Sequence, residues 1–509
     1  MSGPDDGGRR RRWNPLAGPA RSLGHFTRRT RGTQVRTVLL VVAVLGGTTL
    51  WIATAPASSS PAPAVASTAG PAAGVHQAST SSRGVTATSV NVVFPVVSLN
   101  SLAGQEGFAE DVEFGQQDEA IRLFVDQINR AGGINGRRIN PIITSYDPAS
   151  ESDMRALCKT WTEGSPAAFA VLDGAGAWTG DNQLCITQEG QTPFLGEWTT
   201  VTSWTDQGSP YLWWTGPDQA AVLKAVVDWG LSAHLLGGDR RVGVVAGDRA
   251  SDQAALDDVL LPALHRAGIT PVVATLASDP SETATTDSEA PLIVQQFRSA
   301  GVDSVIPLIP FNAFFPLLQA QTSQGYFPRL LLSDYESSIE ASLGLLPIPY
   351  ADALNGQEGV TTETLGGIDD DRPQSRGGYD PGLRSCWTVW HKAYPQIPPG
   401  TLSFYIEEQG PIAEWCQTIR LFAEAAEGAG RDLNRRTFVT ALSKITDFPG
   451  TVTPVLSYGP DKRYGPTQYQ VVRLHINTPP SSQCKMPLDK IPQGTCWVTV
   501  RPFAPLPAP

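Results

Sequence analysis

An alternation of strand-like and helix-like segments, which extends from residue 90 to residue 332, constrains the fold of this chain more than any other feature. Residues 90–97 form an apolar run of the kind that fills a buried strand. In the segment that follows, apolar side chains recur at helical spacing: Phe114, Ile121, Phe124 and Ile128. A strand that is repeatedly followed by a helix gives a parallel sheet, because the helix carries the chain back to the starting edge. The pattern therefore predicts an α/β fold.

The alternation runs through two consecutive series. We expect strands of the first series at residues 90–97, 138–146, 167–172 and 193–197, and strands of the second at 241–246, 270–276, 304–309 and 329–332. Helices are expected between them at residues 152–163, 181–189, 218–235, 251–267, 291–300 and 314–324. Two series predict two lobes, each with its own parallel sheet. A ligand of such a protein binds beyond the carboxyl ends of the strands, where the two sheets face each other.

The N-terminal region reads as an export signal. Residues 1–36 are basic, with nine Arg and two Asp, and residues 37–55 carry no charge. The apolar stretch at 38–53 suits either a signal peptide cleaved at Ala55-Pro56-Ala57 or an uncleaved membrane anchor. Both alternatives place the rest of the chain outside the cytoplasm. Residues 56–84, rich in Ala, Ser and Pro, are expected to form a linker.

Charge and cysteine content narrow the possible functions. The net charge is −11, so the chain beyond residue 36 carries about −18, which argues against a nucleic-acid partner. An exported chain with six Cys is expected to form three disulfides. Sequence proximity suggests the pairs Cys158–Cys185, Cys386–Cys416 and Cys484–Cys496, among fifteen possible pairings. No C-x-x-C and no helical His pair is present, so we expect no metal site.

Catalytic motifs are missing from the sequence, which contains no G-x-S-x-G, no H-E-x-x-H and no P-loop. The glycine-rich loop at residues 173–180, with Glu197 about 20 residues on, raises the alternative of a dinucleotide site. Its spacing is G-x-G-x-x-x-G and it follows the third strand, so we favour binding of an anionic group by backbone N–H groups. We therefore expect a binding protein without cofactor or catalytic residue rather than an enzyme.

Aromatic residues follow the expected strands of both lobes. Trp178 and Trp198 fall after strands of the first series, and Phe311 and Tyr335 after strands of the second. Rings at these positions can stack on a ligand, although core packing is the alternative for each. Asp334 and Glu336, on either side of Tyr335, are candidates for pairing with a cationic group, with plain solvation as the alternative.

A set of motifs, taken in order, resembles a known family. The motifs are DQINRAGGINGRR at residues 126–138, YDP at 146–148, the strand-loop-helix at 242–268, GQEGV at 356–360, the helix at 411–430, FPGT at 448–451 and YGPD at 458–461. They resemble the type 1 periplasmic solute-binding proteins of the leucine/isoleucine/valine-binding kind, and they cover residues 90–475. Cys158–Cys185 lies where members often carry a disulfide.

The resemblance implies two Rossmann-like α/β lobes with parallel sheets, joined by a three-crossing hinge near residues 216, 355 and 450. Lobe 1 would comprise residues 85–216 and 355–450, and lobe 2 residues 217–354 and 451–475. Residues 476–509 would form a disulfide-clamped tail outside the family pattern. The resemblance also implies a monomer that delivers its ligand to an ABC permease in the membrane. Some relatives instead serve as tethered sensors or receptors.

The family's pocket residues carry over in part. The loop after the third strand would offer Gly176, Trp178 and Thr179 to a ligand carboxylate, and the loop after the fourth would offer Trp198, Thr199 and Thr200. The second lobe would contribute Phe311, Asn312, Asp334, Tyr335 and Glu336. Trp198 is larger than the usual residue, and the family's D-x-x-Y-G reads DRASD at residues 248–252. These departures extend the expected ligand from amino acids to other small amides and organic acids.

Overall fold

The computed structural model describes residues 82–98, 117–174, 181–197, 200–335, 350–364, 381–395, 412–476 and 496–509. All of them belong to one compact unit, Val75–Pro509. The expected signal segment lies outside the described residues, as do residues 56–81 of the expected linker and residues 175–180 of the glycine-rich loop. Among the helices that are described, none is long and apolar enough to cross a membrane.

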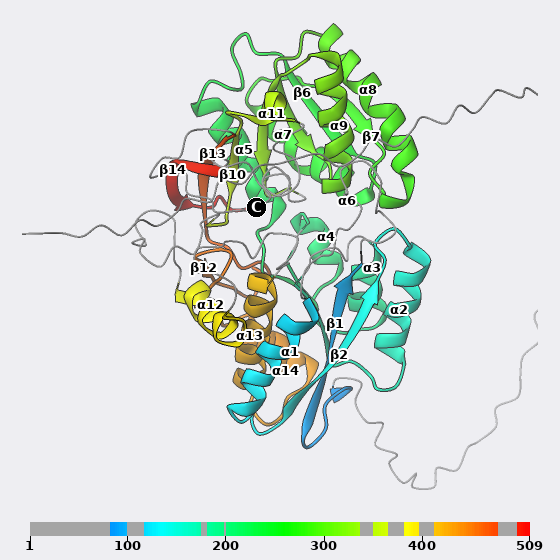
Figure 1. The fold of residues 1–509 in the computed structure, drawn as a ribbon, viewed down its shortest axis with the longest axis vertical. Helices are drawn as coiled ribbons and strands as arrows, with labels where there is room; N and C mark the ends of the chain where they lie inside the picture. The colour runs from blue at the N-terminus through cyan, green and yellow to red at the C-terminus, as the bar shows by residue number, and fades with distance from the viewer. Residues whose placement is uncertain are drawn as a thin grey trace, which may run out of the picture. The chain divides into compact units, whose positions relative to one another are not determined.

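The first sheet contains five strands, all parallel, in the order β2-β1-β3-β4-β5. They are β1 (Ser89–Val97), β2 (Arg138–Tyr146), β3 (Ala170–Asp173), β4 (Phe194–Gly196) and β5 (Leu212–Trp214). Helices cover this sheet: α1 (Gln117–Arg130), α2 (Glu151–Glu163), α3 (Asp181–Leu184), α4 (Thr202–Gln207), α12 (Pro381–Ala393), α13 (Ile412–Gly428) and α14 (Arg435–Leu442). In Figure 1, α1, α13 and α14 lie on one side of β1 and β2, and α2 and α3 lie on the other.

The second sheet contains seven strands in the order β14-β13-β10-β9-β8-β6-β7. They are β6 (Val242–Gly247), β7 (Val272–Leu276), β8 (Ser304–Leu308), β9 (Arg329–Ser333), β10 (Glu358–Thr361), β13 (Gln468–His475) and β14 (Cys496–Pro505). The pairs β10–β13 and β13–β14 are antiparallel and the others are parallel. The helices of this sheet are α5 (Gln219–Ser232), α6 (Ala250–Ala254), α7 (Leu261–Arg266), α8 (Thr283–Ser299), α9 (Phe311–Gln324) and α11 (Ala351–Leu354).

The predicted fold class, two α/β lobes with parallel sheets, is confirmed, and three of the predicted helices need correction. The helix predicted at 181–189 is α3 followed by a π-helical turn, Cys185–Glu189. The helix predicted at residues 291–300 begins at Thr283 and contains Pro291 in its interior. The helix predicted at 251–267 spans α6, a π-helical turn (Ala255–Leu260) and α7. A proline near the middle of a segment was read as a helix start because proline is favoured there, yet the helix forms on both sides of it.

Three connections join the sheets. The first, residues 215–218, leads from β5 to α5, and Asp218 caps α5 by accepting a hydrogen bond from Ala220 N at 2.8 Å. The second leaves β10 at Thr362. The third, residues 457–467, leads to β13 from β12 (Val455–Leu456), which pairs with β11 (Phe448–Pro449). Since β10 belongs to the second sheet, the chain leaves that sheet after Thr361.

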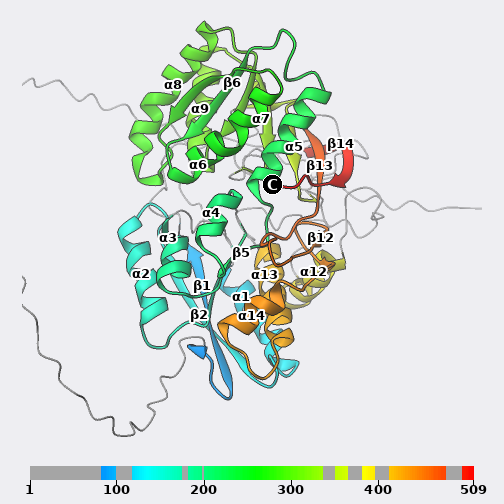
Figure 2. The same cartoon turned by 180° about the vertical axis from the view of Figure 1, so that it is seen from behind.

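The C-terminal strand β14 extends the second sheet beyond β13, and this strand was not anticipated from the sequence. Its end follows the third connection, where Leu506 N donates to Thr467 O at 2.9 Å. The Arg501 guanidinium lies 4.3 Å from the ring centre of Trp229 on α5. The end of the chain therefore packs against α5, as both ribbon views show (Figures 1 and 2).

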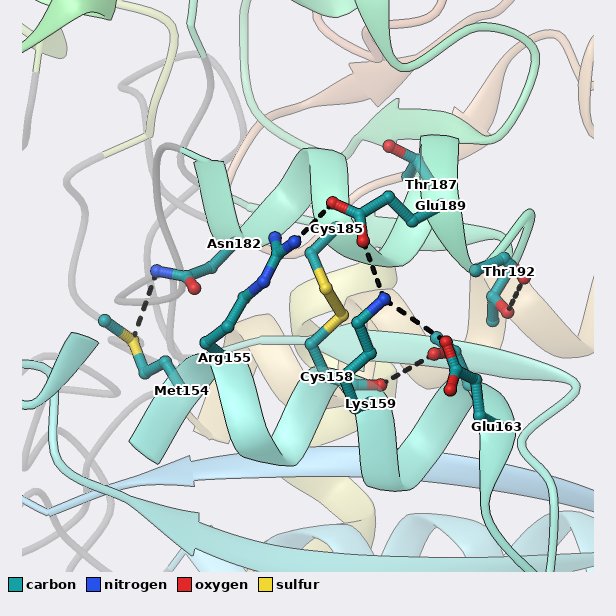
Figure 3. The surroundings of a disulfide bond; sticks show 12 residues. Met154, Arg155, Cys158, Lys159, Glu163, Asn182, Cys185, Thr187, Glu189 and Thr192 are labelled. Carbon is teal, nitrogen blue, oxygen red and sulfur yellow. Dashed lines mark hydrogen bonds and ion pairs between the residues drawn. A yellow bond between two sulfur atoms is a disulfide. The ribbon is translucent and has the colours of Figure 1, made fainter. Parts of the chain in front are cut away.

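Two disulfides are present among the described residues, and both were predicted. Cys158–Cys185 joins α2 to the π-helical turn (Cys185–Glu189) that continues α3, and Cys386–Cys416 joins α12 to α13. Figure 3 shows the first disulfide beside an ion-pair network in which Glu189 binds Arg155 and Lys159. The third predicted pair includes Cys484, which lies outside the described residues.

Candidate functional site

The carboxyl ends of the parallel strands form one edge of each sheet, and these edges are the candidate site. In the first sheet, β3 and β4 end in register, with Asp173 opposite Gly196. In the second sheet, β6 and β7 end with Gly247 opposite Leu276. The helices that follow β4 and β6, α4 and α6, are in contact and lie side by side in both views (Figures 1 and 2). The two edges therefore meet at these helices.

Asp252 is the centre of the second-sheet edge. It lies on α6, is completely buried, and accepts hydrogen bonds from two Arg249 nitrogens at 2.8 and 2.9 Å. The Tyr335 hydroxyl donates to Asp252 Oδ1 at 2.7 Å, and the Ser278 hydroxyl lies 3.3 Å from Oδ2. A buried carboxylate needs this number of donors to offset its lost hydration. Asp252 thus fixes the loops after β6, β7 and β9 relative to one another.

Two predicted residues at the start of α9 join the same edge. Asn312 Nδ2 donates to Ser278 O at 3.1 Å, which ties α9 to the loop after β7. The Phe311 ring lies edge-on to Phe315, with ring centres 4.8 Å apart. Both residues are partly exposed. They remain predicted ligand contacts, and the structure places them beside the Asp252 cluster.

Asp334 and Tyr335 have structural partners in the second lobe. Asp334 Oδ2 accepts from Thr362 N at 2.6 Å and from the Thr362 hydroxyl at 2.9 Å. Asp334 O accepts from Gln219 Nε2 at 3.1 Å. Tyr335 is 2% exposed, with its hydroxyl on Asp252. These contacts show what the two side chains hold together, and a ligand contact for either one remains a prediction.

The remaining predicted ligand contacts, apart from Thr200, lie outside the described residues: Gly176, Trp178, Thr179, Trp198, Thr199 and Glu336. Thr200 is partly buried, and its carbonyl accepts from Gln219 N at 3.3 Å. This bond joins the loop after β4 to the first turn of α5. Thr200 therefore lies where the first lobe meets the first connection.

The first-sheet edge carries buried acidic groups. Asp173 at the end of β3 is 1% exposed and Glu197 just after β4 is 6% exposed. Burial raises the pKa of Tyr146, at the end of β2, well above its ordinary value, and the negative charge of Asp173 adds to this effect. The sequence drew attention to Glu197 for a different reason, as part of the alternative of a dinucleotide site.

Sequence reasoning missed Arg249, Asp252 and Ser278 as members of the site. The segment at residues 248–252 was noted only because it departs from a family motif. An Arg and an Asp three residues apart at a helix start do indicate an ion pair, and this was the usable signal. Ser278 had none, because its partners Asp248 and Asp252 are 30 and 26 residues away in the sequence.

Within the described ranges, no group of three or more His, Cys, Asp or Glu side chains is placed to hold a metal ion. A family model described as a periplasmic binding protein matches residues 105–358. The chain belongs to this family. Its members are type 1 binding proteins of ABC transporters, and the resemblance inferred from the motifs is confirmed. No curated protein sequence matches the chain.

Solved structures share this fold at low sequence identity. The fatty acid ABC transporter substrate-binding protein from Thermomonospora curvata is 17% identical with a TM-score of 0.57, covering 83% of this chain and 93% of that one. A solute-binding protein from R. palustris in complex with 4-hydroxybenzoate is 14% identical with a TM-score of 0.58, covering 82% and 98%. A branched-chain amino acid ABC transporter protein from Thermus thermophilus with bound valine is 14% identical with a TM-score of 0.56, covering 82% and 96%. At these identities the likeness shows the fold alone.

Membership of the family gives the coarse function. Periplasmic binding proteins bind solutes outside the cytoplasm, and the related structures are transport proteins rather than enzymes.

Proposed function

We propose that this protein captures a small polar organic solute between its two lobes and delivers it, as a monomer, to an ABC-type permease. The observation that carries the proposal is the contact between α4 and α6, which brings the carboxyl-end edges of both sheets together. A solute held there would touch both lobes, so that binding favours closure of the lobes around it.

The second-sheet edge supports a preorganised binding wall. Four donors hold the Asp252 carboxylate, so the loops after β6, β7 and β9 keep their positions without ligand. A ligand then gains its contacts without the cost of ordering these loops. We propose that Phe311 and Asn312 contact the ligand from this wall, and that Trp198, Thr199 and Thr200 contact it from the first lobe.

The chemical class of the solute is proposed as an amino acid, amide or organic acid. The structurally similar proteins carry fatty acid, 4-hydroxybenzoate and valine in their descriptions. Asp252 is fully committed to Arg249, Tyr335 and Ser278, so it does not supply a counter-charge for a ligand ammonium group. This favours organic acids over α-amino acids as the first ligands to test.

Native mass spectrometry of the freshly purified protein tests the proposal most directly, because a closed binding protein often retains its solute. Titration calorimetry of residues 83–509 would then compare 4-hydroxybenzoate, octanoate, leucine and valine. We expect Phe311→Ala and Trp198→Ala to weaken binding of the true solute at least tenfold. Phe327→Ala is the matched control, since Phe327 is 45% exposed and precedes β9 at the opposite edge of the sheet.

Two results would refute transport binding. One is the absence of any bound or titratable solute from these classes, and the other is turnover of the bound molecule. A tethered sensor of the same fold is the alternative, favoured by the uncharged run at residues 37–55. A mature chain that retains this run, determined by intact-mass measurement, would support the alternative.

A further inference from the structure

The joint between the lobes contains a buried carboxylate. Asp218 is the last residue of the first connection and is 2% exposed. Its Oδ1 accepts from Ala220 N at 2.8 Å, at the start of α5, and its Oδ2 accepts from the Thr202 hydroxyl at 2.7 Å, at the start of α4. Helix α4 belongs to the first lobe and α5 packs on β9 and β10 of the second. One carboxyl group therefore joins the two lobes.

A second bond reports on the same joint. Gln219 N donates to Thr200 O at 3.3 Å, so the first residue of α5 is also held by the loop that precedes α4. If the lobes rotate about the first connection, this bond and the Thr202–Asp218 bond lengthen together. The amide hydrogen of Gln219 is therefore a local indicator of how the lobes are joined.

Charged and titratable groups face Asp218 from two elements. Lys224 lies on α5, and Lys462 and Tyr464 lie on the third connection. The Lys462 ammonium is held by four backbone carbonyls, those of Ser457, Tyr464, Gly465 and Pro466, at 2.5 to 3.2 Å. It is thus fixed near Asp218 without making an ion pair with it. Two of the three connections contribute to this joint.

Burial acts on the charge of Asp218. Removal from water raises the pKa of Asp218 from its ordinary 3.8 to about 6, against the opposing effect of the Thr202 and backbone hydrogen bonds. An arrangement that admits water to the joint returns the pKa toward its ordinary value. The protonated form is therefore favoured by the packed joint and the ionised form by the hydrated joint.

We propose that the protonation state of Asp218 controls the joint between the lobes. When its carboxylate takes up one proton from solvent, the two lobes shift toward the packed arrangement seen here. After uptake, the carboxyl O–H donates to Thr202 Oγ1, so the bond between the lobes persists with its direction reversed. The carboxyl O–H is the only covalent bond that forms, and the hydrogen of the partly exposed Thr202 hydroxyl, released from the carboxylate, turns to water. The joint goes beyond solute capture, since it acts with or without a solute.

Hydrogen exchange at the Gln219 amide tests the joint without any ligand. Corrected for the intrinsic effect of pH, exchange in the ligand-free protein should be about tenfold slower at pH 5.0 than at pH 7.5, from linkage between the two pKa values. X-ray scattering at the same two pH values should show a smaller radius of gyration at pH 5.0. A corrected exchange ratio within twofold of unity would overturn the proposal.

Two variants and one control separate Asp218 from other titrating groups. Asp218→Asn imitates the protonated carboxyl, so its corrected exchange should be slow at both pH values. Persistence of the wild-type ratio in this variant would assign the effect to another group, such as Lys462, whose pKa is lowered by burial to about 7, and would sink the proposal. Glu163→Gln removes an exposed carboxylate on α2 and should behave as wild type.

Thr202→Val keeps Asp218 but removes its partner on α4. Exchange at Gln219 should become at least threefold faster at both pH values. Thr202→Val tests the proposal even if Asp218→Asn does not fold, because unchanged exchange at Gln219 would show that the Thr202–Asp218 bond does not hold the lobes together. Failure of any of these tests leaves the proposed solute binding standing, since native mass spectrometry addresses that separately.

Discussion

The carboxylate of Asp334 accepts both the backbone N–H and the hydroxyl of Thr362, at 2.6 and 2.9 Å. Asp334 follows β9, and Thr362 is the first residue after β10, so this pair fixes the point where the chain leaves the second sheet. The Asp334 carbonyl also accepts from Gln219 at the start of α5. Asp334 therefore links the first and second connections between the lobes.

Replacing Asp334 with Ala should lower the free energy of unfolding by about 1–3 kcal/mol, because it leaves the Thr362 N–H and hydroxyl without their acceptor. Thr362→Val removes only the hydroxyl donor and should cost roughly 1 kcal/mol. Urea denaturation measures both. Asp258→Ala, at an exposed position of the π-helical turn, is the control. Equal stability of Asp334→Ala and this control would contradict the structural role of Asp334.

Asp252→Ala should lower the free energy of unfolding more than Asp334→Ala does. It removes the buried carboxylate that pairs with the Arg249 guanidinium and accepts from Tyr335, and breaking a buried pair from one side costs about 3–5 kcal/mol. Tyr335→Phe removes one hydrogen bond and should cost about 1 kcal/mol. Thermal unfolding followed by circular dichroism checks the order of the two effects. A larger loss for Tyr335→Phe than for Asp252→Ala would show that the Tyr335 hydroxyl, and not the Asp252 carboxylate, organises this edge.

The sequence was sufficient to predict eight of the twelve strands described in the two sheets (β1 to β4 and β6 to β9) and two of the disulfides, because these depend on local periodicity and proximity. It was not sufficient to assign the atoms of the site. Tyr335 and Asp334 were placed correctly after a strand, but spacing cannot tell a ring that faces a ligand from one whose hydroxyl binds Asp252. That distinction depends on which loops meet in space.

Contacts between residues far apart in the sequence explain why Asp218 and strand β14 were not predicted. Asp218 was expected only as the start of a helix, since its bond to Thr202 spans 16 residues and two lobes. Strand β14 escaped notice because the disulfide predicted for its region suggested an irregular tail. The segment between β13 and β14 contains no two-residue turn motif of the kind that predicts a β-hairpin. Neither feature has a local sequence signature.

The disulfide Cys158–Cys185 should stabilise the first lobe. It closes a sequence separation of 27 residues between α2 and the helix after β3, and Cys158→Ala with Cys185→Ala should cost about 2–4 kcal/mol. The neighbouring ion pairs of Glu189 are about half exposed, and exposed pairs contribute little. Glu189→Gln should therefore leave the unfolding midpoint almost unchanged. A comparable loss for both variants would mean that the ion pairs, rather than the disulfide, fix the two helices.

Lys462 should be the most sensitive residue of the third connection. Its nitrogen lies within hydrogen-bond distance of four carbonyls in one tight loop, which share its N–H donors, and it lies 4.2 Å from the Tyr464 ring centre. Lys462→Met keeps the apolar stem but deprives the carbonyls of donors, which should cost roughly 2–4 kcal/mol. Hydrogen exchange of residues 457–467 should rise together with this loss. Lys444→Met, at an exposed position after α14, should change neither quantity. If Lys462→Met matched that control, water would be satisfying the carbonyls and the loop would hold its shape without the lysine.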